Sequence, residues 1–346
     1  MAIVQSLSQS RVIDPILTTM AIGIKIPQYI GGLAFPPVFC PKRAATILSF
    51  GTKEEKFLYA TRRARGANTM RISTGYGDTK VELYQDAIES ELPYETLEES
   101  DGIVALQQRS VYLVKQKLCH RLEFDQLALL GNFAGYPTTN RLLLTGTNQF
   151  SDVNSPIEQL FDNAKDAIVR GIGMLPNTII FGGLKAYNAV KRHPFFKNQF
   201  QRAGTRTITA GLIAEALDIP RYGISLATWI DPVNPLVETA MFDNKIWIGY
   251  VPGAGDVALT SEANAGSNIN LLSGVNPSIN ANNATPSFGY TYLRTQAQAG
   301  GQDTGLAMYA PYEGKNERTW YFQGVADRLP AVTGLAAGYL FDNVSA

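Results

Sequence analysis

The most constraining feature of this sequence is an uninterrupted amphipathic pattern from Thr96 to Asn132. The stretch contains no proline, and Gly131 followed by Asn132 is a typical helix stop. A capping box of Thr96 and Glu99 is expected to open the helix. At about 1.5 Å per residue it would be roughly 50 Å long, which suits a strut better than a compact enzyme core. Its apolar face has helical spacing and comprises Val104, Val111, Val114, Leu118, Leu122 and Leu129.

Composition and charge exclude several classes of protein. The 346 residues include 30 lysines and arginines and 30 aspartates and glutamates, and this balance argues against a dedicated nucleic-acid binder. We expect neither a membrane span nor a signal peptide, because no run approaches roughly 18 apolar residues. Cys40 and Cys119 are expected to be reduced thiols in a cytosolic setting, although the sequence leaves a bridge between them open.

Residues 1–45 are predicted to form an extended arm. Five prolines and the pair Gly31–Gly32 prevent a long helix here. The segment is nevertheless rich in isoleucine, leucine and phenylalanine, unlike a disordered tail. An apolar extended segment needs a surface, and we expect this surface to be the long helix and neighbouring copies of the chain. An arm folded back on its own chain is the alternative.

Residues 46–95 consist of short strand-like pieces separated by charged or glycine-rich turns. Strands are predicted at 46–50, 56–59, 69–72 and 80–84, with turns at 62–66 and 75–78. So few apolar residues cannot support a core of their own. The region is therefore predicted to be a long two-stranded excursion from a larger body.

The rest of the chain has no regular strand–helix–strand repeat, which indicates an α+β fold rather than a doubly wound one. A helix is predicted to begin with Ser155 as N-cap and Pro156 at its first position. Two more helices are predicted at 184–191 and 209–217, and residues 260–287 are predicted to be a long loop. Strands are predicted at 178–181, 222–229, 237–251, 289–296, 320–327 and 339–341.

Two passages resemble the major capsid proteins of tailed bacteriophages, which have the HK97-like fold. Residues 175–194, LPNTIIFGGLKAYNAVKRHP, look like that family's strand and following helix, with a basic pair and His-Pro at the end. Residues 320–343, WYFQGVADRLPAVTGLAAGYLFDN, are similar to its closing strand and small-residue tail. The order of arm, two-stranded loop, strut helix and β-rich region also resembles the family over nearly the whole chain.

The resemblance implies five regions. These are an N-terminal arm at 1–45, an extended two-stranded E-loop at 46–95, a P-domain at 96–205, an A-domain at 206–290, and return strands with a C-terminal tail at 291–346. The spine helix of the P-domain would span about 96–132.

The resemblance also implies a function, a location and partners. The chain would be a structural protein, not an enzyme, without a cofactor or metal, whose copies form hexamers and pentamers of an icosahedral shell. The shell would enclose double-stranded DNA without sequence-specific binding and would involve no membrane. The implied location is the virion, after assembly in the host bacterial cytoplasm. Further implied partners are portal and scaffolding proteins and, as in some relatives, a decoration protein.

The sequence offers little for catalysis. His120 lies beside Cys119, but adjacent residues of a helix point in different directions, so a nucleophile pair is not indicated. Gly182–Gly183 follows a predicted strand without the dinucleotide fingerprint, and packing of helix on strand explains both glycines. Zinc, hydrolase-elbow and phosphate-loop motifs do not occur.

A cluster of arginines in the loop region is the candidate site. Five acidic residues are expected to lie around the root of the loop and the start of the long helix: Glu89, Glu91, Glu95, Glu98 and Glu99. Because tip and root of an extended hairpin are far apart, we expect these charges to meet between neighbouring chains. Two solvated surface patches are the alternative. The predicted inter-subunit contact joins Arg62, Arg63 and Arg65 to Glu95, Glu98 and Glu99.

Two other functions stay open on the sequence. One is an encapsulin-like compartment, which shares the fold and holds an enzyme cargo. The other is a soluble α+β enzyme with an unrecognised site, against which the apolar arm argues.

Overall fold

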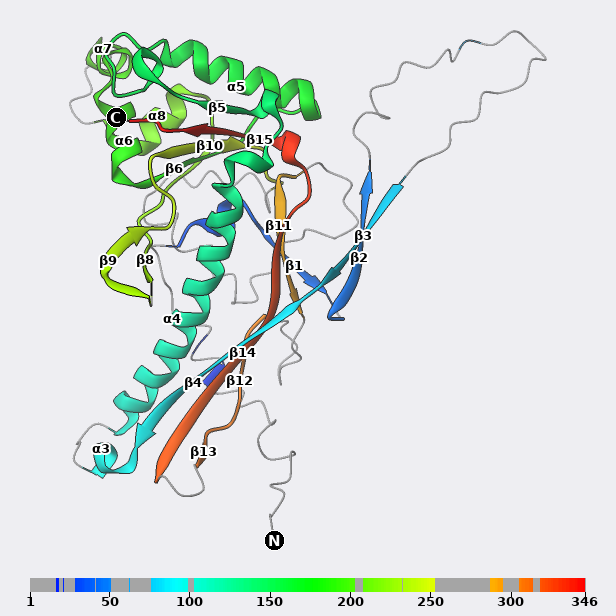
Figure 1. The fold of residues 1–346 in the computed structure, drawn as a ribbon, viewed down its shortest axis with the longest axis vertical. Helices are drawn as coiled ribbons and strands as arrows, with labels where there is room; N and C mark the ends of the chain where they lie inside the picture. Colours follow the sequence, from blue (N-terminus) through cyan, green and yellow to red (C-terminus); the bar gives the residue numbers. More distant parts are fainter. Residues whose placement is uncertain are drawn as a thin grey trace.

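The computed structural model describes residues 17–18, 21, 29–40, 42–50, 62, 76–98, 103–202, 208–231, 233–252, 287–294, 305–313 and 318–345. Figure 1 shows a body of helices packed around a short-stranded sheet, from which a long helix and long strands extend. A two-stranded ribbon leaves these strands at the side. The α+β class predicted from the sequence is confirmed.

A six-stranded sheet forms the extended half of the molecule. Its central strand β14 (Thr319–Val332) pairs antiparallel with β4 (Tyr84–Pro93) from Thr319↔Pro93 to Arg328↔Tyr84. The end of β14 pairs with β11 (Gly289–Arg294), which β1 (Pro37–Cys40) joins in parallel. Two short strands complete the sheet, β12 (Ala307–Met308) and β13 (Tyr312–Glu313).

The long helix α4 (Ile103–Leu130) lies across β4 and β14. Its predicted apolar face is confirmed at Val111, Val114, Leu118 and Leu122, which are all at most 4% exposed, whereas Leu129 is only partly buried. The side chain of Val104, also predicted on this face, lies outside the described part of the structure. Gly324 of β14 lets the helix approach closely, because a Cβ at this position would collide with Val114. At about 1.5 Å per residue, the 28 residues of α4 span roughly 42 Å.

The beginning of the helix was predicted wrongly. The structure has a separate short helix, α3 (Tyr94–Glu98), before α4, and Thr96 lies inside it. The expected capping partner Glu99 lies outside the described residues. The Tyr94 amide donates to the Arg318 carbonyl at 2.9 Å, so a long-range contact with the neighbouring strand ties α3 down. The predicted stop is confirmed, because α4 ends at Leu130.

A five-stranded sheet forms the second body, in the order β5–β15–β10–β6–β7. Its strands come from widely separated parts of the chain, and β6 at its interior is buried at all its residues. The strands are β5 (Arg141–Leu143), β6 (Thr178–Phe181), β7 (Arg221–Ile224), β10 (Lys245–Gly249) and β15 (Gly338–Asp342).

Four helices surround this sheet (Figure 1). Phe150, Phe161 and Phe341 share one apolar core, with ring centroids 5.3–5.5 Å apart. The helices are α5 (Ile157–Ile172), α6 (Gly183–Arg192), α7 (Pro194–Arg202) and α8 (Ala210–Ala216). Short 3-10 helices in the described ranges are η1 (Gly31–Leu33), η2 (Phe133–Gly135), η3 (Thr138–Asn140), η4 (Gly146–Asn148) and η5 (Leu335–Ala337).

Two ribbons, each of two strands, project from these bodies. In the first, β2 (Ala44–Phe50) pairs antiparallel with β3 (Tyr76–Glu82). In the second, β8 (Thr228–Asp231) pairs with β9 (Asn234–Ala240). Both ribbons are drawn in Figure 1 as hairpins away from the two larger sheets.

The described part of the arm lies in the core of its own chain, which is the alternative that we favoured less. Ile30, Leu33 and Phe35 are at most 5% exposed and pack with Leu127 and Leu130 of α4. Of the arm before residue 29, only residues 17–18 and 21 are described. For residues 29–40 the expected contact with the long helix is confirmed, and the expected contact with neighbouring copies stays a prediction.

The two-stranded excursion predicted over residues 46–95 is too long, because part of this range belongs to the large sheet. β4 belongs to the six-stranded sheet, since it pairs with β14 along its whole length. Residues 76–78, predicted as a turn, form the start of β3. The predicted strands at 56–59 and 69–72 lie outside the described residues. A sequence pattern could not separate these cases, because the partner that makes β4 a sheet strand is far along the chain.

The elements after residue 150 follow the predictions more closely. β6 has the predicted bounds, and α5 begins one residue later than expected, at Ile157. α7, which follows His193, was not predicted. The predicted domain boundary between residues 205 and 206 crosses one sheet, because β6 pairs with both β7 and β10. The predicted loop at 260–287 lies outside the described residues, apart from Ser287.

Candidate functional site

The residues of the predicted charge contact are only partly described. Arg62 is exposed, whereas Arg63, Arg65 and Glu99 lie outside the described residues. Glu95 and Glu98 are both exposed on α3. Within the described ranges no ion pair joins Arg62 to either glutamate. The structure thus brings together two of the predicted acidic residues and leaves the arginine side untested.

The acidic residues lie at an end of the molecule that we had not expected. β4 runs away from the β2–β3 ribbon and leads into α3, so its far end is remote from the root of that ribbon (Figure 1). Across β14, β13 reaches the same end, because Trp320 pairs with Leu92 on one side and Glu313 on the other. We call the exposed carboxylates there the acidic end: Glu89, Glu91, Glu95, Glu98 and Glu313.

The negative charges of the acidic end are not neutralised by positive side chains among the described residues. None of its carboxylates forms an ion pair with another described residue. Glu89 accepts a hydrogen bond from the Tyr312 hydroxyl at 3.0 Å, and this contact raises the pKa of Tyr312 together with burial. Several negative charges therefore remain available to a positively charged partner.

A buried carboxylate holds the root of the β2–β3 ribbon. Asp327 of β14 is fully buried and accepts hydrogen bonds from Arg43 at 3.1 and 3.2 Å and from Arg294 at 3.0 Å. Its hydrogen bond and charge raise the pKa of Arg43. Because Arg43 directly precedes β2 and Arg294 ends β11, this cluster joins the ribbon to two strands of the large sheet.

Arg328, the next residue of β14, lies on the opposite face of the sheet, because successive side chains of a strand alternate between its two faces. Arg328 is 2% exposed and donates through Nε to Asp86 of β4 at 2.6 Å. Its Nη1 and Nη2 have no hydrogen-bond partner among the described residues. Asp327 and Arg328 therefore connect the ribbon root on one face and β4 on the other.

The arm is attached to α4 by a second set of polar contacts. Glu123 is 1% exposed and accepts hydrogen bonds from the backbone amides of Ile30 and Gly31 at 2.9–3.0 Å. Burial raises the pKa of this carboxyl to about 7, and the two amide bonds oppose the shift. Tyr29 and His120 approach at 3.2 Å between hydroxyl and Nδ1. Sequence reasoning missed Glu123, whose only local signal was a carboxylate beside the apolar face.

The residues weighed for catalysis serve structural roles. Burial raises the pKa of Cys119 to about 11, so its thiol is a poor nucleophile at neutral pH. Both cysteines are free thiols. A Cβ at Gly182 would lie 2.7 Å from the Lys245 carbonyl of β10, so the neighbouring strand, and not the predicted packing of helix on strand, explains this glycine. Gly183 is explained by its positive φ of 71°. Among the described residues, no group of three or more metal-binding side chains converges.

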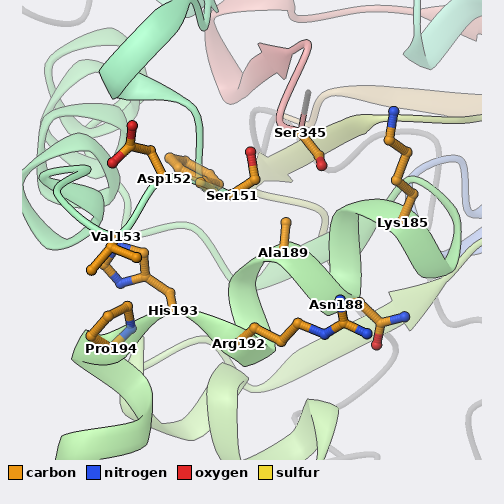
Figure 2. Close-up of a pocket in the computed structure, with 11 residues that line it drawn as sticks. Ser151, Asp152, Val153, Lys185, Asn188, Ala189, Arg192, His193, Pro194 and Ser345 are labelled. Atoms are coloured by element: carbon orange, nitrogen blue, oxygen red, sulfur yellow. The ribbon is translucent and has the colours of Figure 1, made fainter.

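One open cavity of about 350 Å³ lies between α6 and the segment before α5 (Figure 2). Lys185 and Arg192 are exposed at its rim, and Figure 2 draws the His193 ring next to Val153 and above Pro194. The His193 Nδ1 accepts from the Phe195 amide at 3.2 Å, and burial lowers the pKa of this imidazole. His193 thereby fastens the turn between α6 and α7. The cavity lining presents mixed charge and no recognisable catalytic arrangement.

None of the helices in the described ranges combines the length and the apolar character that a membrane crossing requires.

Comparison with known proteins finds a similarity to a phage capsid protein. The chain is 28% identical over 246 residues to the major capsid protein of Burkholderia phage BcepMu, covering 71% of this chain and 78% of that protein. No protein-family model matches the sequence.

Solved structures reproduce the fold. A phage-related protein of Bordetella bronchiseptica RB50 matches 97% of this chain and 98% of its own, with a TM-score of 0.70 and 27% identity. The capsid of cyanophage P-SCSP1u matches 92% of this chain and 88% of its own, with a TM-score of 0.54 and 9% identity. The SrpI encapsulin of Synechococcus elongatus PCC 7942 matches the same shares, with a TM-score of 0.51 and 10% identity. The latter two likenesses concern the fold alone.

Proposed function

Since this chain is a major capsid protein of a tailed bacteriophage, with the HK97-like fold, we propose that its copies associate as hexamers and pentamers that close into the icosahedral phage head. It is a structural protein of the virion, and its function is to form contacts of defined geometry with neighbouring copies. Repeated contacts between different surfaces of neighbouring copies must rotate each subunit so that the lattice closes. The observation that carries the proposal is the match to the BcepMu capsid protein over 71% of the chain.

We assign the parts of the molecule to regions of the HK97-like fold. The E-loop corresponds to β2, β3 and the residues between them, and excludes β4. The P-domain corresponds to the six-stranded sheet with α4 as its spine. The A-domain corresponds to the five-stranded sheet with its helices, so it begins well before residue 206 and includes β15. The cohesion of each sheet supports these revised boundaries.

The charge contact remains a proposal for the interface between neighbouring subunits. The acidic end offers exposed Glu95 and Glu98, together with Glu99, to the cluster of Arg62, Arg63 and Arg65 on the next copy. Its support is that none of the described residues forms an ion pair with the carboxylates of the acidic end. An exposed pair contributes only about 0–1 kcal/mol, but the contact recurs at every subunit of a closed lattice.

Charge reversal tests this contact. Changing the three arginines to glutamate should leave folded subunits that fail to close shells. Adding Glu95→Arg, Glu98→Arg and Glu99→Arg should partly restore closure. Shells of wild-type size and salt resistance from the arginine variant, observed by electron microscopy, would show that other contacts join the subunits.

Other components of a phage head complete the proposal. The shell encloses double-stranded DNA without sequence-specific binding, and the neutral formal charge of the chain argues against a dedicated nucleic-acid binder. Portal and scaffolding proteins, and a decoration protein where one is used, are the expected partners.

The decisive experiment is assembly of the expressed protein. Size-exclusion chromatography with light scattering should give a mass far above 37.7 kDa, and electron microscopy should show closed particles. A nucleic-acid and protein assay of particles from infected cells separates a phage head from an encapsulin-like compartment, because the fold is shared. A strictly monomeric protein would contradict the proposal.

A further inference from the structure

The β8–β9 ribbon has two faces of different character. Its pairs Trp229↔Thr239 and Ile230↔Glu238 place successive side chains on opposite sides. Trp229 lies on the side toward α4, where its ring meets Phe124 edge-on with centroids 5.0 Å apart. Ile230 and Glu238 share the other side. The register shifts between Ile230 and Asp231, so Val233 and Leu236 lie in the irregular stretch at the tip of the ribbon. We call the exposed apolar side chains of Ile230, Val233 and Leu236 the outward face.

The outward face and the tip of the ribbon are unusually apolar for a surface. Leu236 is 94% exposed, Val233 at the turn is 90% exposed and Ile230 is 53% exposed. Scattered single apolar residues need no explanation, but these three lie within seven residues on one projecting hairpin. None of the described residues of the chain covers them.

The ribbon is also not extended by a further strand among those that the structure describes. β8 and β9 pair only with each other among the described strands. A two-stranded ribbon alone is marginally stable in water, and a third strand or a packed face is needed for more. The contact of Trp229 with Phe124 covers one face only.

We propose that the outward face of the β8–β9 ribbon, formed by Ile230, Leu236 and the tip residue Val233, packs against a second copy of this chain. The inference rests on the proposed function and names one of the surfaces that assembly uses. In a closed ring of identical subunits, a projecting element of each copy meets a different surface of the next. The same ribbon then recurs at every contact of this kind.

The chemistry of the ribbon favours a protein partner over nucleic acid. Residues 226–241 contain two acidic residues, Asp231 and Glu238, and no lysine or arginine. A phosphate backbone would be repelled here, because nucleic-acid binding depends on cations. A second copy is the protein that a self-assembling shell brings to this face at high local concentration.

Assembly of Leu236→Asp tests the proposal, with Val153→Asp as matched control. Val153 is also exposed, at 68%, but lies in the segment before α5. Leu236→Asp should keep the wild-type circular dichroism and melting temperature of the free subunit and lose at least tenfold in particle yield. Val153→Asp should assemble normally. Wild-type particle yield for Leu236→Asp, or an equal loss in both variants, would overturn the inference.

A labelling experiment covers the case in which Leu236→Asp fails to fold. Leu236→Cys and Val153→Cys are treated with a maleimide as free subunits and as particles. We expect modification of Leu236→Cys to slow at least tenfold on assembly, and that of Val153→Cys to change little. Equal labelling of Leu236→Cys in both forms would overturn the inference. If wild-type protein forms no particles at all, the proposed function itself fails, and the two outcomes are thereby distinguished.

Discussion

Both carboxylate oxygens of Glu123 accept the backbone amide of Gly31, at 3.0 and 2.9 Å. This contact joins a residue in the C-terminal half of α4 to residue 31, 92 positions earlier in the chain. No positive side chain contributes to the pKa of this carboxyl, which is governed by burial and by the two amide bonds. A buried charge held by amides alone makes the arm attachment sensitive to protonation.

Glu123 should make stability fall as the pH rises. Its pKa is about 7 in the folded chain, against about 4.3 for a glutamate in an unfolded chain. Between these values the folded protein binds more protons than the unfolded one, so the free energy of unfolding decreases from about pH 4.5 to about pH 7. The expected contribution of this one group is about 2–4 kcal/mol.

Glu123→Gln isolates this effect, because other groups also titrate across this range. Denaturant unfolding of free subunits at half-unit pH steps should show a difference between the two proteins that grows with pH in favour of the variant. Parallel stability curves for wild type and variant would contradict the assignment of the titration to Glu123.

Gly31→Ala should destabilise the arm attachment severely. An added Cβ would collide with the side-chain oxygen of Gln126 and lie 2.9 Å from a Glu123 oxygen, inside a fully buried site. We expect a loss of about 2–4 kcal/mol, as for other overpacked or strained core positions. Hydrogen exchange of residues 29–36 should accelerate most. Gly211→Ala in α8 is the control, since its Cβ would meet Tyr222 only at 3.4 Å and alanine favours helix. Comparable destabilisation by both changes would refute the steric argument.

Leu118→Asp should prevent accumulation of folded protein. Leu118 is 4% exposed on the apolar face of α4, and an unpaired carboxylate there would be buried among apolar side chains. The expected cost exceeds about 4 kcal/mol. Gln108→Glu, at an exposed position of the same helix, should change stability by less than about 0.5 kcal/mol. Soluble yield and thermal melting measure both, and equal behaviour would mean that the buried face is misassigned.

Asp327→Asn should loosen the root of the β2–β3 ribbon without unfolding the subunit. The neutral amide cannot accept charge-assisted bonds from both Arg43 and Arg294, and we expect a loss of about 1–3 kcal/mol. Hydrogen exchange should increase in β2 and β3 more than in α5. Asp166→Asn, which removes an exposed pair with Arg170, should cost less than about 0.5 kcal/mol. A uniform change of exchange across the subunit would count against a local clamp.

Local patterns in the sequence were sufficient for the elements whose partners are close along the chain. The apolar face of α4 and the bounds of β6 followed from spacing, because side chains within a few turns or one short strand define their own buried face. The α+β class followed from the order of these elements. Within the site, sequence alone supplied the acidic residues of α3 but placed them at the wrong end of β4.

The tertiary structure alone decided which extended segments belong to the body. β4 becomes a sheet strand because Glu89 pairs with Gln323 of β14, and residues 29–40 become core because Glu123 and β11 receive them. Such contacts join residues that are distant in sequence, so no local periodicity encodes them. An apolar segment broken by prolines requires burial, and only the folded chain determines that β11 of the same chain takes residues 37–40 into its sheet.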